Sequence, residues 1–156
     1  MQVCRYLPTP DDVASTFEAL MGRDVSACTL EDVGFALAKV ACYRRNDGTL
    51  AAMIGMDLAL ACSAGAALTM IPNQSVREAT ATGVLPTNLD ENLYEVLNVS
   101  AVVFTTGDPH RLTMTSTHQG LDHDDLVAAA ASAAQTLGMT LRIDGYLEGR
   151  AILWVF

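Results

Sequence analysis

The chain has 156 residues, of which 51% are hydrophobic, and its formal net charge at pH 7 is −9. This length and composition predict a single domain over residues 1–156 and exclude a disordered chain. The acidic balance, with no basic cluster beyond Arg44-Arg45, excludes a nucleic-acid surface. No apolar run is long enough to cross a membrane.

The N-terminus and the cysteines give expectations about location and redox state. No basic segment followed by an apolar stretch opens the chain, so no secretory signal is evident and we expect a cytoplasmic protein. The four cysteines are widely spaced and include no C-x-x-C pair: Cys4, Cys28, Cys42 and Cys62. We therefore expect reduced, mostly buried thiols.

The first half of the chain predicts a helix, a hairpin and a buried helix. Prolines and acidic residues precede a predicted helix over Asp11–Met21. Apolar runs over Val33–Tyr43 and Thr49–Met56 flank an Asn-Asp-Gly turn, so we expect antiparallel neighbours. The run Leu58–Ile71 is rich in small residues and predicts a buried helix that the next proline ends.

The second half continues the alternation of helices and strands. A short helical segment over Ser75–Thr82 precedes a helix over Thr87–Phe104, and a strand follows over His110–His118. An alanine-rich helix is predicted over Asp122–Leu137, with Gly138 as its stop, before a hairpin at the C-terminus. The pattern predicts the α+β class, with a two-layer, largely antiparallel sheet packed with helices.

The predicted helix Thr87–Phe104 has an apolar face and a polar face. At ~100° per residue, the side opposite to the leucines carries Glu91, Glu95, Asn98 and Val102. We expect Asn88 to be the N-cap, with Glu91 three residues later completing a capping box. This helix can therefore bury one face and present the other.

A weak internal repeat relates this helix to the first. Laying Phe17–Met21 on Tyr94–Asn98 also lays the predicted strand near Phe35–Val40 on Leu112–Thr117. Helix falls on helix and strand on strand, which favours an internal pseudo-duplication. Both halves then carry the glutamate, but only the second carries the asparagine.

Glu95 and Asn98 are spaced i and i+3, so they project side by side from the helix. A carboxamide both donates and accepts hydrogen bonds, and can hold a water in line with a phosphorus atom. The glutamate can bind a cation of a partner protein. The pair suits hydrolysis of a phosphate that the partner presents.

The chain resembles the CheC/CheX family of chemotaxis phosphatases, which is related to the flagellar switch protein FliY. The family's mark, E-x-x-N on an exposed helix, is matched by Glu95-Val96-Leu97-Asn98. Residues Gly48–Ile71 are similar to the family's strand, Gly-Met, helix unit, and RIDGYLEGRAILWVF is similar to its terminal hairpin. The resemblance covers most of the chain after about Pro10.

The resemblance implies a function and a site. Glu95 would pair with the lysine of a CheY-type response-regulator receiver domain, and Asn98 would orient the water that attacks its aspartyl phosphate. Mg²⁺ would come with the receiver, so we expect no cofactor and no metal site on this chain. Glu91, Val99 and Val102 are candidates for the surface that docks the partner.

Departures from the family pattern keep alternatives open. Met21 stands where the first half would need an asparagine, so we expect one site at most. Glu91 stands where family members often have Asp or Ser. No proline occurs about twenty residues after Asn98, near Leu121, where the family has one. The alanine-rich helix after Asp122 is also unusual for the family. A non-catalytic module that binds a receiver or switch-type partner is the second hypothesis, and a small-molecule sensor is the third. Homodimer formation stays open.

Histidines and acids near the start of the alanine-rich helix do not predict a metal site. The acids suit the N-terminus of a helix, and His118 lies at a strand end with no fixed geometry to its neighbours, which are Asp122, His123, Asp124 and Asp125. No glycine-rich phosphate-binding motif occurs, so nucleotide binding is not expected.

Overall fold

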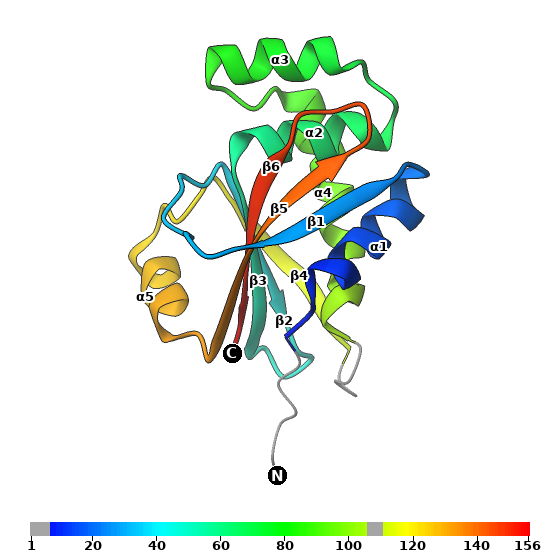
Figure 1. Ribbon diagram of the computed structural model, residues 1–156. Coiled ribbons are helices and arrows are strands. Elements are labelled where there is room, and N and C mark those ends of the chain that lie inside the picture. The colour runs from blue at the N-terminus through cyan, green and yellow to red at the C-terminus, as the bar shows by residue number, and fades with distance from the viewer. Residues whose placement is uncertain (1–6, 106–110) are drawn as a thin grey trace.

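The structure of the protein is a computed structural model that describes residues 7–105 and 111–156. Within these ranges the chain forms one antiparallel sheet of six strands, in the order β1-β5-β6-β3-β2-β4 (Figure 1). The strands are β1 Val25–Leu30, β2 Lys39–Arg44, β3 Leu50–Met56, β4 Thr113–His118, β5 Gln135–Ile143 and β6 Gly149–Val155. The predicted α+β class with an antiparallel sheet is confirmed.

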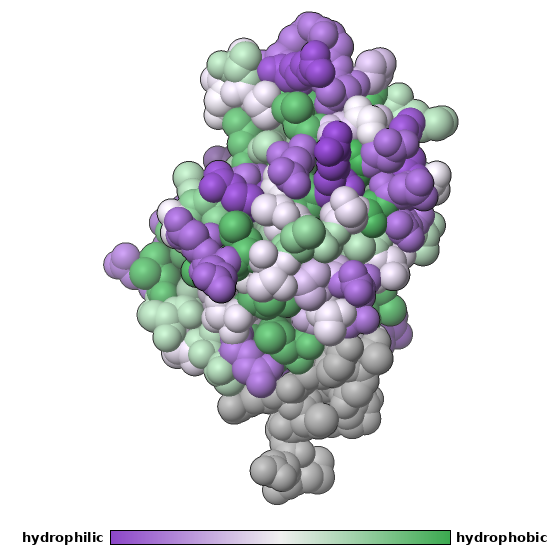
Figure 2. Space-filling model, viewed as in Figure 1, coloured by the Kyte–Doolittle hydropathy of each residue, from purple (hydrophilic) through white to green (hydrophobic). Residues whose placement is uncertain are grey.

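Helices cover both faces of this sheet. They are α1 Pro10–Met21, α2 Leu58–Leu68, α3 Asn73–Thr82, α4 Thr87–Val99, the 3₁₀ helix η1 Ser100–Phe104 and α5 Asp124–Ser132. In the part of the chain that the structure describes, every helix is too short or too polar to cross a bilayer. On the side of the molecule seen in Figure 2, hydrophilic and hydrophobic residues are interspersed.

The two faces of the sheet bury different side chains. Along β2, Ala41 and Tyr43 point into the main core, whereas Val40 and Cys42 point into a smaller core with Leu126 of α5. This alternation follows from the period of two along a strand. Figure 1 shows α5 standing apart on the left of the sheet, with α1 and α4 on the right. Helix α4 therefore lies over the main core.

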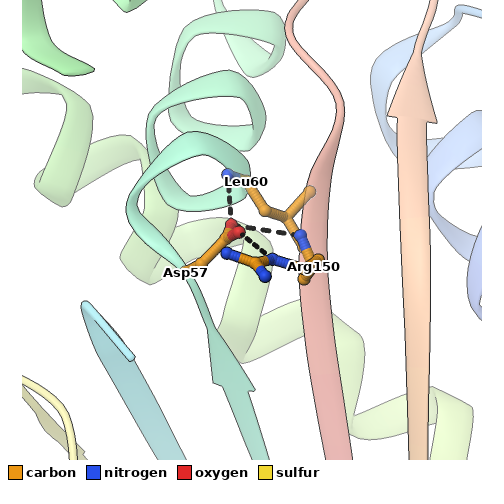
Figure 3. A network of polar contacts seen from close by, with 3 residues as sticks. All are labelled: Asp57, Leu60 and Arg150. Carbon is orange, nitrogen blue, oxygen red and sulfur yellow. Dashed lines mark hydrogen bonds and ion pairs between the residues drawn. The ribbon is translucent and has the colours of Figure 1, made fainter. Parts of the chain in front are cut away.

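Short-range side-chain contacts fix the starts of α1 and α2. Thr9 and Asp12 form a capping box at α1. At α2, Asp57 Oδ1 accepts a hydrogen bond from the Leu60 backbone N–H at 2.9 Å. The Asp57 carboxylate also accepts hydrogen bonds from Arg150 of β6, from the backbone N–H at 3.1 Å and from Nε at 3.0 Å (Figure 3). This carboxylate thus joins the start of α2 to the central strand β6.

Helix α4 lies where the sequence predicts a helix, but both of its ends differ from the expectation. The N-cap is Pro86, with no side-chain cap, so the expected Asn88–Glu91 capping box is wrong. Proline supplies a suitable φ of −64° before the first turn. At the other end Ser100 Oγ donates to the Val96 carbonyl at 2.6 Å, and the chain continues as η1. Such back-bonding is typical where helices bend.

One strand in the first half of the chain was not predicted from the sequence. The segment Val25–Leu30 is β1, whereas the strand predicted over Val33–Tyr43 is restricted to β2. Strand β1 lies at the edge of the sheet and only Val25 is buried. Edge strands with so little burial lack the apolar alternation on which strand prediction depends. The hairpin of β2 and β3 is confirmed, with Gly48 at φ +87° in its turn.

The alanine-rich helix is shorter than predicted. It ends at Ser132, and Gln135–Leu137 belong to β5, which pairs with β6 and continues through Gly138. The prediction of Gly138 as a helix stop is therefore wrong. A Cβ at Gly138 would lie 2.7 Å from the Leu30 carbonyl oxygen, so the close approach of β1 requires glycine there. The terminal hairpin of β5 and β6 is confirmed. Strand β4 covers most of the predicted His110–His118; His110 lies outside the described residues.

The order of the strands is compatible with an internal pseudo-duplication. Exchanging β1, β2 and β3 with β4, β5 and β6 leaves the order of the sheet unchanged. Helices α1 and α4 precede the two outer strands β1 and β4. In a pseudo-duplicated sheet of this order the counterpart of β4 would be β1, whereas the sequence repeat aligns the segment near Phe35–Val40 with Leu112–Thr117.

Cysteine burial follows the expectation in part. Cys42 and Cys62 are buried free thiols, whereas Cys28 of β1 is an exposed one. Cys4 lies outside the described residues. Burial raises the pKa of the Cys62 thiol to about 11, and the nearby Asp57 carboxylate adds to the shift.

Candidate functional site

Helix α4 presents its polar face to solvent. Its apolar side chains are buried: Leu89, Leu93, Val96 and Leu97. Glu95 and Asn98 are both exposed, as the helical period predicts. Neither side chain has a hydrogen-bond or ion-pair partner in the ranges 7–105 and 111–156. The pair is therefore available to a partner molecule.

Buried contacts hold α4 in a fixed orientation beneath this pair. Tyr43 of β2 donates a hydrogen bond from its phenol to the Leu97 carbonyl at 2.6 Å. The ring of Tyr43 packs on Phe104, with ring centroids 5.5 Å apart. Because a buried phenol joins the sheet to the residue before Asn98, the exposed carboxamide stands on a rigid support.

Helices α2 and α4 also pack closely against each other. A Cβ at Gly65 of α2 would lie 2.3 Å from the Leu89 carbonyl oxygen, so only glycine allows this approach. Asn92 Nδ2 donates to the Gly65 carbonyl at 2.9 Å and to Thr69 Oγ1 at 2.8 Å. These contacts fix the first half of α4 as Tyr43 fixes the second.

An acidic groove runs between α4 and the edge strand β4. Its volume is about 360 Å³, and it is lined by Thr87, Asp90, Glu91, Tyr94, Glu95 and Thr117. Asp90 forms an ion pair with Lys39 (Nζ to Oδ1 2.7 Å). Glu91 and Glu95 have no cationic partner among the described residues. Two unneutralised carboxylates on one wall suit a cationic side chain of a partner.

Val99 and Val102 line a second, apolar groove. They are 44% and 52% exposed, and the groove of about 420 Å³ that they border is closed by α1 through Ser15, Thr16, Ala19 and Leu20. In sequence, Asn98 lies between Glu95, which lines the acidic groove, and Val99, which lines the apolar one. Glu91 and Glu95 thus border one groove and Val99 and Val102 the other, and Asn98 is exposed on the helix that separates them.

In α1, the sequence repeat aligns Glu18 with Glu95 and Met21 with Asn98. Both α1 residues have structural roles. Glu18 Oε1 accepts a hydrogen bond from the Val25 backbone N–H at 3.0 Å and so anchors the start of β1. Met21 is half-buried against the main core. The α1 residues that match Glu95 and Asn98 thus serve the fold.

Sequence reasoning missed Lys39. This lysine is 6% exposed, lies at the start of β2 and shares a cleft of about 500 Å³ with its partner Asp90. Leu37, Leu58 and Leu85 also line the cleft. A charged residue inside the run Val33–Tyr43 was the signal available in the sequence. The lysine neutralises one of the three carboxylates of the acidic groove, so Glu91 and Glu95 carry its remaining charge.

Comparison with known proteins identifies the fold. No family model matches the chain, and no curated protein matches its sequence. A chain of the FliM–SpeE complex from H. pylori matches with a TM-score of 0.61 at 8% identity, covering 94% of this chain and 80% of that one. The FliM middle domain from Vibrio alginolyticus matches with a TM-score of 0.58 at 6% identity, covering 94% and 88%.

The chemotaxis protein CheX from Vibrio vulnificus matches with a TM-score of 0.51 at 10% identity, covering 92% of this chain and 91% of that one. The fold expected from the resemblance to CheC/CheX proteins is therefore confirmed. At these identities the likeness shows the fold alone, and the function is argued from the site.

Proposed function

We propose that the chain is a CheC/CheX-like phosphatase that hydrolyses the aspartyl phosphate of a CheY-type receiver domain. The observation that carries the proposal is the pair Glu95 and Asn98, which is exposed, has no partner among the described residues and stands on a rigidly held helix of a CheX-like fold. Asn98 orients the attacking water and Glu95 docks the receiver's lysine.

The carboxamide of Asn98 suits the chemical step. Its Oδ1 accepts a hydrogen bond from a water and directs a lone pair of that water toward the phosphorus, in line with the bond to the aspartate. The carboxamide is not consumed and takes no proton. The receiver would bring the Mg²⁺ and the lysine that balance the charge on the equatorial oxygens. This chain therefore contributes position rather than a nucleophile or a base.

The acidic groove suits the docking step. Glu95 shares it with Glu91, and both carboxylates face solvent. An exposed ion pair contributes at most ~1 kcal/mol to affinity. The groove therefore steers the receiver and sets its register more than it tightens the complex. The groove that Val99 and Val102 line beside α1 supplies further, apolar contact area for the receiver.

The decay of a phosphorylated receiver tests the proposal. The wild-type chain should accelerate the decay. Asn98→Ala should abolish the acceleration without loss of stability, because the side chain is exposed and has no hydrogen-bond partner within residues 7–105 and 111–156. Asn88→Ala is the matched control, since Asn88 is also exposed on α4, and should retain full acceleration. Equal acceleration by both variants would refute the assigned role of Asn98.

A non-catalytic interaction module is the second candidate function. One solved structure that this chain matches is that of a FliM–SpeE complex, and Met21 leaves α1 without the asparagine. A receiver or switch-type partner would then bind the same surface without hydrolysis. Saturable binding of a receiver by the wild-type chain, with an unchanged rate of phosphate loss, distinguishes the module from the phosphatase.

A further inference from the structure

Two histidines and an aspartate converge where β4 leads into α5. His118 Nδ1 lies 3.7 Å from Asp122 Oδ1, and His123 Nε2 lies 3.8 Å from the same oxygen. One ligand atom from each of the three residues lies within 4.8 Å of the other two. From the sequence, no fixed geometry is expected here. The structure brings the three side chains together.

A tight turn creates this convergence. Gly120 has φ +89°, and a Cβ there would lie 2.8 Å from the Leu37 carbonyl oxygen. The turn therefore needs glycine for both conformation and space. It folds Asp122 back onto His118 and places His123 at the N-cap of α5.

The spacing of the donor atoms is close to that of a tetrahedral metal site. Zinc binds imidazole nitrogen and carboxylate oxygen at ~2.1 Å, which places neighbouring donor atoms about 3.4 Å apart. The separations of the two imidazole nitrogens from Asp122 Oδ1 exceed this value by a few tenths of an ångström, and the two nitrogens lie within 4.8 Å of each other. Rotation of the exposed His123 and Asp122 side chains closes that difference. Two imidazoles and one carboxylate are a ligand set that zinc prefers.

The second nitrogen of His118 is already held. Its Nε2 lies 3.0 Å from Ser116 Oγ, two residues earlier on β4. Metal-binding histidines commonly donate their other ring N–H to such a partner, which fixes the ring and the tautomer. With Nε2–H donating to the Ser116 hydroxyl, Nδ1 is the free lone pair facing Asp122.

Helix α5 is the element that such a site would secure. Leu126 is its one buried residue, so few contacts hold the helix on the sheet. A cation at its N-terminus meets the positive end of the helix dipole, but Asp124 and Asp125 in the first turn offset it.

We propose that His118, Asp122 and His123 form a zinc-type site, with water in the fourth position, that fastens the start of α5 to the edge strand β4. The site is independent of Glu95 and Asn98. Thr117 lines the acidic groove on the α4 side, and the next residue of a strand faces the opposite side. Loss of zinc binding therefore does not imply loss of phosphatase activity, and each proposal can be refuted without the other.

Calorimetric titration of the metal-free, reduced full chain with Zn²⁺ alone tests the site. The wild-type chain should bind one ion. His118→Ala, His123→Ala and Asp122→Asn should each weaken binding by more than the ~10–100-fold that loss of an outer partner costs, and Ser116→Ala should fall within that range. Asp125→Asn and Cys28→Ser are the matched controls and should bind as the wild type does.

Two further readouts separate a built site from surface binding. Zinc should raise the melting temperature of the wild type and of both controls but not of the three ligand variants. Cobalt in place of zinc should give visible d–d bands without a thiolate charge-transfer band. A dissociation constant weaker than about 0.1 mM, unchanged binding in the ligand variants, or binding lost in Cys28→Ser would each overturn the site.

Discussion

The hydroxyl of Tyr43 donates its hydrogen bond to the carbonyl of Leu97, the residue immediately before Asn98, at 2.6 Å. Tyr43 is fully buried, and burial raises the pKa of its phenol, so the group stays protonated and remains a donor. The contact connects strand β2 with the exposed helix face that carries the candidate site.

Tyr43→Phe should therefore destabilise the protein and loosen this face. Removing the hydroxyl deletes this buried hydrogen bond to the Leu97 carbonyl, which costs ~1 kcal/mol in the free energy of unfolding. Urea unfolding measures the loss. Tyr94→Phe is the matched control, because Tyr94 is 49% exposed, and it should change stability by less than ~0.5 kcal/mol. Equal losses in the two variants would show that the buried hydrogen bond has no special role.

Reversing the charge of Glu95 should weaken receiver binding through the association rate. Glu95→Lys places a cation in the groove that Glu91 also lines, and we expect about tenfold weaker binding at low salt, with a smaller difference at high salt. Surface plasmon resonance at two ionic strengths measures both effects. Glu78→Lys on α3 carries the same change of net charge away from the groove; if it weakens binding as much, overall charge and not the groove steers the receiver.

The valine-lined groove should contribute apolar contact area to the partner. Val102→Asp puts a charge into that groove and should weaken binding by about tenfold, with little effect on stability because the side chain is 52% exposed. Val127→Asp on α5, at 49% exposure, is the control and should bind normally. Normal binding by Val102→Asp would remove this groove from the docking surface.

The Cys62 thiol should make stability sensitive to alkaline pH. Its pKa is about 11 in the folded protein and 9.0 in its ordinary state. The unfolded chain therefore releases this proton first as the pH rises. The stabilisation is complete below pH 9 and is lost as the pH rises through 11, by on the order of 2–3 kcal/mol. Cys62→Ala should show a shallower fall in the free energy of unfolding between pH 8 and 10.5; parallel curves would contradict the shift.

The helices with strong local signals were predictable from the sequence. The period of apolar residues along α4 fixed which face is buried, and so the exposure of Glu95 and Asn98. The Asn-Asp-Gly turn likewise predicted the β2–β3 hairpin. These signals are carried by neighbouring residues, which is why one sequence suffices to read them.

Elements that depend on distant partners were not predictable in the same way. Strand β1 exists because β5 pairs with it across more than half the chain. Pairing with β6 turns Gln135–Leu137 from predicted helix into strand. Alanine-rich sequence favours a helix, but tertiary pairing overrides that preference. Two side-chain groups were not predicted for the same reason, because their geometry is set by folded loops and strands. They are the Lys39–Asp90 ion pair and the His118–Asp122–His123 cluster.

The interleaved order of the strands has a consequence for how the chain folds. The two central strands, β3 and β6, come from opposite halves of the sequence, and β1 reaches the sheet only through β5. Neither half therefore contains a complete sheet. Closing such long loops is costly in entropy before any contact repays it. The main core, and with it the support beneath Asn98, can assemble only after β6 has been synthesised.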